Sequence, residues 1–282
     1  MAAGGERVRM SAGELRRELS ARNLARAETM VHEATYGPVP SVLYAQAENR
    51  AAHGNFVAAS YRRICADQEW ARRLRKSYTG GERVPRRHDR WRSELDCANS
   101  SDALLMNLFC YPGVTRRPEF CQLLGVEAGL RPEFGVRVQV PLGSGRFDRT
   151  EVDMELGDCL VEAKLTETGF QQARPALLER YRDLEEVFDV GMLPRARDGC
   201  LYAEYQLVRG VLAAGARGQR FVLLCDGRRR DLIESWFRVL QAVRQWELRD
   251  RLRLLTWQEL SVATPARLRK FLREKYGIEA AA

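Results

Sequence analysis

The stretch that most constrains the fold of this chain runs from Arg149 to Thr166 and reads RTEVDMELGDCLVEAKLT. Apolar and polar residues alternate on both sides of Gly157-Asp158, which is the pattern of two half-buried strands. A two-residue turn with glycine in first place is well suited to a β-hairpin. The stretch therefore predicts a hairpin in which the numbers of opposed residues sum to 315.

This register gives the hairpin one face that is apolar throughout, and we expect that face to pack on the core. Its opposed pairs are Leu156–Cys159, Met154–Val161 and Val152–Ala163. The other face carries most of the charge. Its opposed pairs are Glu155–Leu160, Asp153–Glu162 and Glu151–Lys164.

The Asp153–Glu162 pair predicts a metal site. Opposed Cβ atoms lie roughly 4.5–5.5 Å apart, so two carboxylates repel each other there unless a proton or a cation lies between them. Oxygen ligands of this kind suit Mg²⁺ or Mn²⁺. Lys164 projects from the same face within about 7 Å of Glu162, so an ammonium group would lie beside the metal.

The charge distribution also sets this stretch apart. Residues 148–167 contain seven acidic residues against two basic ones, although the whole chain has a net charge of +8. Only four of the 46 basic residues are lysines, and one of the four is Lys164. Lysine is a compact charge that can lose its proton when partly buried, which arginine cannot do. A lysine here therefore fits a role near an attacking water.

A solvated edge strand is the competing interpretation of the same pattern. Acidic residues on the outer face of an alternating strand commonly serve solubility, and short acid-and-lysine patterns are frequent by chance. The apolar inner face, the direct opposition of the two carboxylates and the helices predicted around the hairpin favour a functional site.

The rest of the chain predicts an α/β fold, with a mixed central sheet flanked by helices. The N-terminal part, residues 1–90, is expected to be a helical extension, and residues 91–282 the core. Predicted helices cover 12–35, 41–76, 173–189, 201–214 and 264–275, together with one that Ser100 or Ser101 caps and one around Trp236. Predicted strands, besides the hairpin, cover 134–142, 221–225 and 252–257.

Composition excludes several classes of protein. No apolar run approaches the roughly 20 residues of a membrane span, and the N-terminus lacks the apolar core of a signal peptide, which predicts a cytoplasmic protein with no membrane partner. The seven cysteines and three histidines are scattered, without the spacing of a zinc site. The estimated pI of about 9.3 is compatible with a polyanionic partner, although a genomic bias toward arginine codons explains it equally well.

The arrangement of Asp153 and Glu162-Ala163-Lys164 resembles the PD-(D/E)xK nuclease superfamily, which has the restriction-endonuclease-like fold. That motif is an acid on the second core strand followed by E-x-K on the third. The order of elements over about 91–260 is similar to the α-β-β-β-α-β core of the superfamily. Val152-Asp153 replaces the proline-aspartate of the name.

The resemblance implies hydrolysis of phosphodiester bonds in nucleic acid, usually DNA. It implies that Asp153, Glu162 and the carbonyl of Ala163 bind Mg²⁺ (or Mn²⁺), and that Lys164 orients the attacking water or stabilises the phosphoryl oxygens. The nearest matches to the accessory residues of the superfamily are Glu94 and Tyr205-Gln206. Two arginine clusters are further candidates for phosphate contacts, with plain solvated loops as the alternative. One consists of Arg86, Arg87 and Arg90, and the other of Arg228, Arg229 and Arg230.

Two other functions remain open at this point. One is a non-catalytic nucleic-acid-binding or scaffolding protein that keeps the fold, against which the complete Asp/Glu/Lys set argues. The other is an α/β enzyme that acts on small molecules, but the chain lacks a phosphate-binding G-x-x-x-x-G-K-[ST] motif. Cutting both strands of DNA would need a homodimer or two successive nicks.

Overall fold

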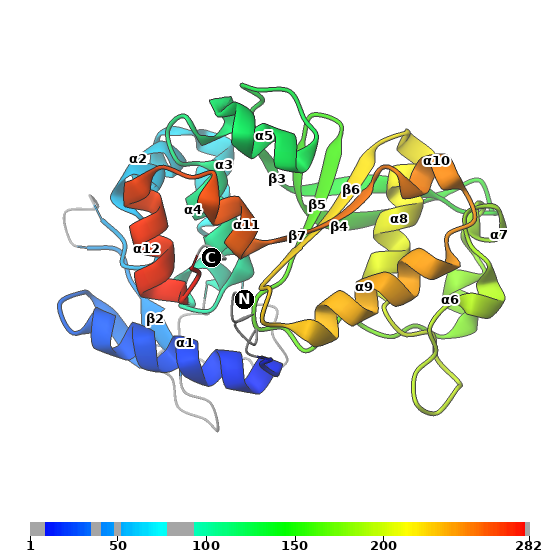
Figure 1. Ribbon diagram of the computed structural model, residues 1–282, viewed down its shortest axis with the longest axis horizontal. Coiled ribbons are helices and arrows are strands. Elements are labelled where there is room, and N and C mark those ends of the chain that lie inside the picture. Colours follow the sequence, from blue (N-terminus) through cyan, green and yellow to red (C-terminus); the bar gives the residue numbers. More distant parts are fainter. Residues whose placement is uncertain (1–8, 35–40, 48–51, 78–92, 280–282) are drawn as a thin grey trace, which may run out of the picture.

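A five-stranded mixed sheet forms the centre of the computed structural model, which describes residues 9–34, 41–47, 52–77 and 93–279 (Figure 1). Its strands, in spatial order, are β3 (Glu133–Pro141), β4 (Phe147–Leu156), β5 (Cys159–Ala163), β6 (Arg220–Cys225) and β7 (Leu252–Thr256). The first three are antiparallel, and β5, β6 and β7 are parallel. The predicted mixed α/β fold, of the restriction-endonuclease-like kind, is confirmed.

Helices cover both faces of this sheet. One layer holds α6 (Pro175–Leu178), α7 (Leu184–Val187), α8 (Tyr205–Arg217), α9 (Arg230–Ala242) and α10 (Trp246–Arg249). The other holds α4 (Ser101–Phe109), α5 (Pro118–Leu124), α11 (Trp257–Val262) and α12 (Ala266–Tyr276). Strand β6, between β5 and β7, supplies Phe221 and Leu223 to the first core and Val222 and Leu224 to the second. It is therefore buried on both faces, as its continuous apolar run predicted.

The predicted hairpin and its register are confirmed. Leu156 pairs with Cys159, and the next two pairs also sum to 315. Gly157 has a φ of +62°, a conformation that favours glycine. All five residues of β5 are buried, because β5 lies between β4 and β6 with helices on both sides. The solvated-edge interpretation is therefore wrong.

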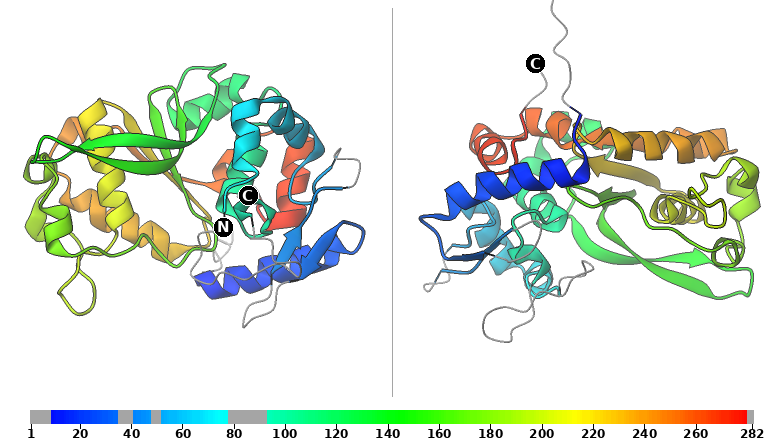
Figure 2. Two further views of the ribbon diagram at one scale, coloured as in Figure 1. Left: turned by 180° about the vertical axis from the view of Figure 1, so that it is seen from behind. Right: turned by 90° about the horizontal axis from the view of Figure 1, so that it is seen from below.

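The prediction of which residues share a face of the hairpin is wrong in one part, because the β4–β5 ladder ends at Met154 and Val161. From there β4 continues against β3 alone, in a long hairpin that reaches toward α6 and α7 (Figure 2). Val152 consequently packs in the core under α8, whereas Met154 packs in the core on the opposite side of the sheet. The predicted Val152–Ala163 and Glu151–Lys164 pairs are not part of the ladder.

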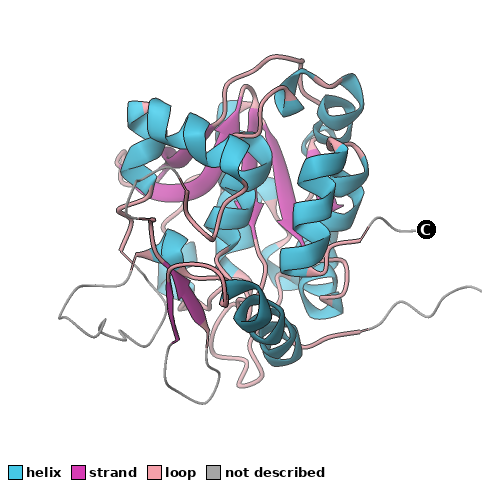
Figure 3. Cartoon of the chain, turned by 90° about the vertical axis from the view of Figure 1, so that its left-hand side faces the viewer, coloured by secondary structure: helices cyan, strands magenta, loops and turns pink. Residues whose placement is uncertain are grey.

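The N-terminal part contains α1 (Ala12–Ala27), α2 (Ala58–Ala66), α3 (Gln68–Arg73) and a separate two-stranded sheet of β1 (His32–Ala34) and β2 (Val42–Tyr44) (Figure 3). The helix predicted over 41–76 is therefore wrong up to residue 57. The Asn55 side chain donates instead to the carbonyls of Leu95 and Cys97, which holds this segment in an irregular path.

Further differences concern short elements. The helix predicted over 173–189 is two short helices, because the Tyr181 side chain turns into the core and bonds the hydroxyl of Tyr205. Helices α5, α10 and α11 were not predicted. The 3-10 turns are η1 (Glu94–Asp96), η2 (Val114–Arg116) and η3 (Val190–Met192). Within the described ranges no helix combines the length and apolarity needed to cross a membrane.

Candidate active site

The point where β4 leaves β5 brings the three predicted site residues together. The last β4–β5 pair is Met154–Val161, so Ala163 has no partner in β4, and its backbone N–H donates to Asp153 Oδ2 at 2.7 Å. Glu162 lies in β5, and Lys164 follows the end of that strand. Lys164 Nζ is 2.8 Å from Glu162 Oε1, and both side chains are buried.

The charges around Asp153 disfavour its ionised form. Burial raises the pKa of this carboxyl well above its usual range, and the carboxylates of Glu162 and Asp102 raise it further. The opposing contributions, from Lys164 and from the N–H of Ala163, are smaller. This repulsion is the condition that a cation between two carboxylates relieves. The donor set of Asp153 and Glu162 therefore fits a hard divalent cation.

The surroundings of Lys164 favour its protonated form. Burial alone would lower the pKa of its ammonium group, but the charges of Glu162, Glu167 and Asp153 outweigh burial and raise it. The prediction that this lysine could lose a proton is therefore not supported in the metal-free protein. Lys164 acts here as a fixed positive charge beside the carboxylates.

Side chains of this site would supply only some of the ligands of a metal ion. Among the residues that the structure describes, no cluster of three or more His, Cys, Asp and Glu side chains is arranged to hold a metal ion. Mg²⁺ commonly uses one or two carboxylates and completes its shell with water and substrate oxygens. Asp153, Glu162 and a main-chain carbonyl would be enough for such a site.

The loop after Lys164 is held from several sides. The indole N–H of Trp257 donates to the carbonyl of Lys164 at 2.9 Å. The guanidinium of Arg229 is fully buried and donates to the carbonyls of Leu165 and Glu167. The Glu167 carboxylate accepts from the backbone N–H of Leu165 and from the hydroxyl of Ser101, which ties this loop to α4.

Two of the arginines named as candidates for phosphate contacts, Arg228 and Arg229, are engaged within the fold. Arg229 is buried against the loop, and Arg228 binds Asp226 and Glu18. Such arginines hold the fold together, a use that the sequence does not distinguish from a basic surface. Arg86, Arg87 and Arg90 lie outside the described residues.

The predicted accessory residues flank the site. Gln206 lies in the first turn of α8, and its N–H donates to the carbonyl of Phe170, whose ring lies 5.6 Å from Lys164 Nζ. Glu94 lies in η1, where its N–H donates to the carbonyl of Lys76. The positions of Gln206 and Glu94 do not show whether either residue takes part in catalysis.

Sequence reasoning missed Asp102, the acid that α4 brings to the site. Asp102 is buried, raises the pKa of Asp153 and forms ion pairs with Arg73 at 2.9 Å and Lys76 at 2.7 Å. A signal was present in the sequence, since Asp102 is the one charged residue in the helix SDALLMNLF, all of whose residues are buried.

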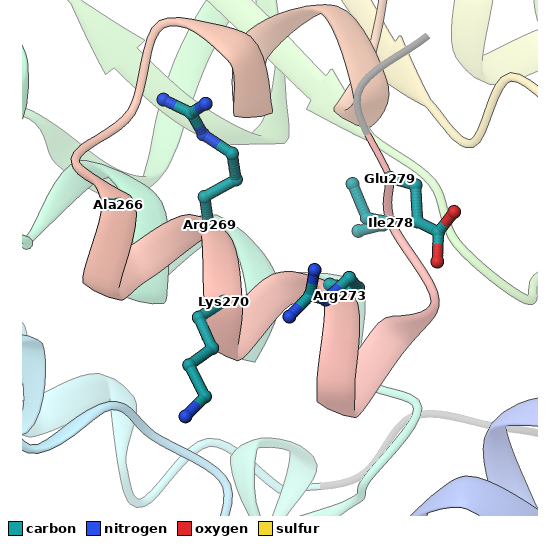
Figure 4. A pocket seen from close by; sticks show the side chains of 6 residues that line it. All are labelled: Ala266, Arg269, Lys270, Arg273, Ile278 and Glu279. Carbon is teal, nitrogen blue, oxygen red and sulfur yellow. The ribbon is translucent and has the colours of Figure 1, made fainter. Parts of the chain in front are cut away.

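Two hollows of the described surface lie elsewhere, on α12. One has a volume of about 360 Å³, and its walls include Arg269, Lys270 and Arg273 (Figure 4). The other, of about 460 Å³, lies between α12 and the end of α1 and shares Lys270. Neither is lined by a residue of the β4–β5 site, so the site is defined by its side chains and not by either hollow.

Comparison with known proteins agrees with this assignment of fold. The family described as "Restriction Endonuclease associating with ARP" matches residues 22–277, which include all five strands of the central sheet. A search of curated proteins found no match, and neither did a search of solved structures. The matched region covers most of the 282 residues, and the chain therefore belongs to the family of restriction endonucleases associating with ARP.

Proposed function

We propose that this protein is a Mg²⁺-dependent nuclease of the PD-(D/E)xK type that hydrolyses phosphodiester bonds in DNA. The observation that carries the proposal is the meeting of Asp153 and Glu162 at the end of the β4–β5 ladder, with Lys164 Nζ 2.8 Å from Glu162. This is an acid–acid–lysine set from two adjacent strands, in a chain of a restriction endonuclease family.

Asp153, Glu162 and the carbonyl of Ala163 would hold the cation, for which Mn²⁺ is an alternative to Mg²⁺. When bound, such a cation supplies positive charge that polarises the phosphate and makes a nearby water easier to deprotonate. Lys164 has three N–H donors, one of which Glu162 uses. Its remaining donors are available to orient the attacking water or to stabilise negative charge on the phosphoryl oxygens.

The direct test is a plasmid-nicking assay. The wild-type protein is expected to convert supercoiled plasmid to nicked or linear DNA with Mg²⁺ or Mn²⁺, and to leave it intact in EDTA. Binding of DNA without cleavage under any of these conditions would favour a non-catalytic binding or scaffolding protein. Parallel reactions on single-stranded DNA and RNA identify the preferred substrate.

Two further properties follow as part of the proposal. Linear product that appears together with nicked circles would indicate coordinated cutting by a homodimer, and delayed linear product would indicate two successive nicks. The family description names an association with ARP. We propose that this chain also works with such a partner.

A further inference from the structure

A second group of charges lies beside the carboxylates of the proposed active site. Lys76 Nζ is 2.7 Å from Asp102 Oδ2 and 3.7 Å from Glu151 Oε1. Arg73 pairs with the same two acids, each at 2.9 Å. Asp102 and Asp153 are close enough to interact, since Asp102 raises the pKa of Asp153. The N-terminal part of the chain thus delivers two cations to the edge of the site.

The fold makes room for this group. Gly135 of β3 lies opposite Asp153, as the pairs on either side of it show. Its φ is +64°, and a Cβ built there would lie 1.9 Å from Arg73 Nη1. The Arg73 guanidinium therefore occupies space that any other residue at position 135 would fill. The carbonyl of Lys76 is fixed by the N–H of Glu94.

The two cations differ in how closely their surroundings hold them. Arg73 is 2.9 Å from both Asp102 and Glu151, and its side chain is 13% exposed. Lys76 is 2.7 Å from Asp102 but 3.7 Å from Glu151, and its side chain is 24% exposed. Both bind the same oxygen, Asp102 Oδ2. Lys76 can therefore turn away while Asp102 remains paired with Arg73, so a large desolvation penalty is avoided.

The balance of charge shows why a mobile cation matters. Three cations face five carboxylates in this cluster. The cations are Arg73, Lys76 and Lys164, and the carboxylates are Asp102, Glu151, Asp153, Glu162 and Glu167. The formal excess is two negative charges, which one divalent cation would neutralise. An approaching phosphate then meets a neutral cluster, and a cation that can turn toward it supplies the attraction.

We infer that Lys76 is a substrate-binding residue that donates to a phosphate of the bound DNA strand next to the Asp153–Glu162 site. This inference rests on the proposed function. Lys76 pairs with Asp102 in the free protein and changes partner when DNA binds. The N-terminal part of the chain would in this way contribute directly to substrate binding.

The test measures binding without cleavage. Affinity for a short DNA duplex of fixed sequence is measured by fluorescence anisotropy over a range of salt concentrations, in an Asp153→Asn background. Into this background are placed Lys76→Met, Lys76→Arg and, as a matched control, Arg75→Gln. Arg75 is a neighbouring exposed cation, so it reports the effect of charge that makes no defined contact.

Lys76→Met is expected to weaken binding about tenfold, the usual effect of losing a charged hydrogen bond. It should also reduce the slope of log affinity against log salt by about 0.9, the value for one phosphate contact. Lys76→Arg should keep most of the slope, and Arg75→Gln should change neither quantity appreciably.

An unchanged slope in Lys76→Met, or no binding of the duplex by the parent protein, overturns the inference. Thermal melts of every variant show whether each is folded, and Lys76→Arg keeps the test valid if the methionine variant is not. The plasmid assay separates the two proposals. Metal-dependent nicking with an unchanged slope removes only the role of Lys76, whereas a wild-type protein that does not nick DNA removes the nuclease function.

Discussion

Lys164 is enclosed closely enough for its shape to matter as well as its charge. Its side chain is buried between Glu162 and the ring of Phe170, and a planar guanidinium is wider and needs more partners. We therefore expect Lys164→Arg to lose activity almost as completely as Lys164→Ala, by about 100-fold or more, as removal of one such electrostatic group typically does. Single-turnover cleavage rates measure this loss, and near-normal turnover in the arginine variant would reduce Lys164 to a general electrostatic role.

The proposed site requires the negative charges of Asp153 and Glu162, and side chains of the same size without the charge would not replace them. Asp153→Asn and Glu162→Gln are expected to abolish Mg²⁺-dependent nicking while DNA binding stays within a few-fold of wild type. Glu155→Gln is a matched control on the same strand, because Glu155 binds Arg217 and Gln219 away from the site. Full activity in either site variant would remove these carboxylates from the proposed metal site.

At the residue scale the sequence indicated which residues come together better than it indicated where charges are buried. The D-x8-E-x-K spacing and the turn at Gly157 were enough to bring Asp153, Glu162 and Lys164 together. The burial of Arg229 was not predicted because nothing local sets it apart from Arg228 and Arg230, and Asp102 was missed although it is the one charged residue of an otherwise uncharged helix. Their burial depends on the 165–167 loop and on Arg73, which lie far from them in the sequence.

Among the elements, the loop that follows β5 depends on Arg229. Arg229→Ala would leave the carbonyls of Leu165 and Glu167 without their donor, and each buried unsatisfied group costs roughly 1–3 kcal/mol. We expect the free energy of unfolding in urea to fall by about 3 kcal/mol. Arg230→Ala, one residue along, should change it by less than about 0.5 kcal/mol. Similar values for the two variants would contradict the structural role assigned to Arg229.

The hairpin itself holds a repulsion that should be measurable in the metal-free protein. The folded-state pKa of Asp153 is raised, so ionising this carboxyl above about pH 3.9, its usual value, favours the unfolded chain. Asp153→Asn should therefore be as stable as wild type at acidic pH. Its advantage over wild type should grow to about 1 kcal/mol as the pH rises to the raised pKa of Asp153, and should stay constant above that pKa.

Mg²⁺ provides the second half of that measurement. Added metal should raise the melting temperature of the wild type, as expected for a ligand that binds only the folded state, and should raise that of Asp153→Asn much less. Identical melting of the two proteins, with and without Mg²⁺, would show that no specific metal site exists at this hairpin.

The register of this hairpin could be predicted because the turn residues and the alternation both indicate it. The departure of Val152 from the predicted face could not, because alternation gives the period of a strand but not the residue at which it leaves a neighbour. At that residue β3 contributes Gly135, whose φ of +64° and missing side chain leave room for Arg73.

At the scale of the whole molecule, the division into an N-terminal helical region (1–90) and a core (91–282) remains a prediction about folding units. The contacts across it are extensive. Leu15 and Leu19 of α1 are fully buried in the same cluster as Met154 and Trp257. Arg16, also on α1, donates to the carbonyl of Thr166 beside the site. We therefore expect the described parts to unfold together.

The matched pair Leu19→Ala and Leu24→Ala tests this coupling. Leu19 is fully buried, whereas Leu24, on the same helix, is 40% exposed. Replacing a buried leucine by alanine costs about 2–5 kcal/mol, and an exposed one about 0.5 kcal/mol or less. If α1 and the sheet form one cooperative unit, Leu19→Ala shifts a single transition, and fluorescence and circular dichroism report the same midpoint. A separate N-terminal unit would instead show two transitions in Leu19→Ala, with the later one unchanged. Because Arg16 and Lys76 both reach the site from this region, the coupled outcome would also mean that the site forms only when α1 is folded against the sheet.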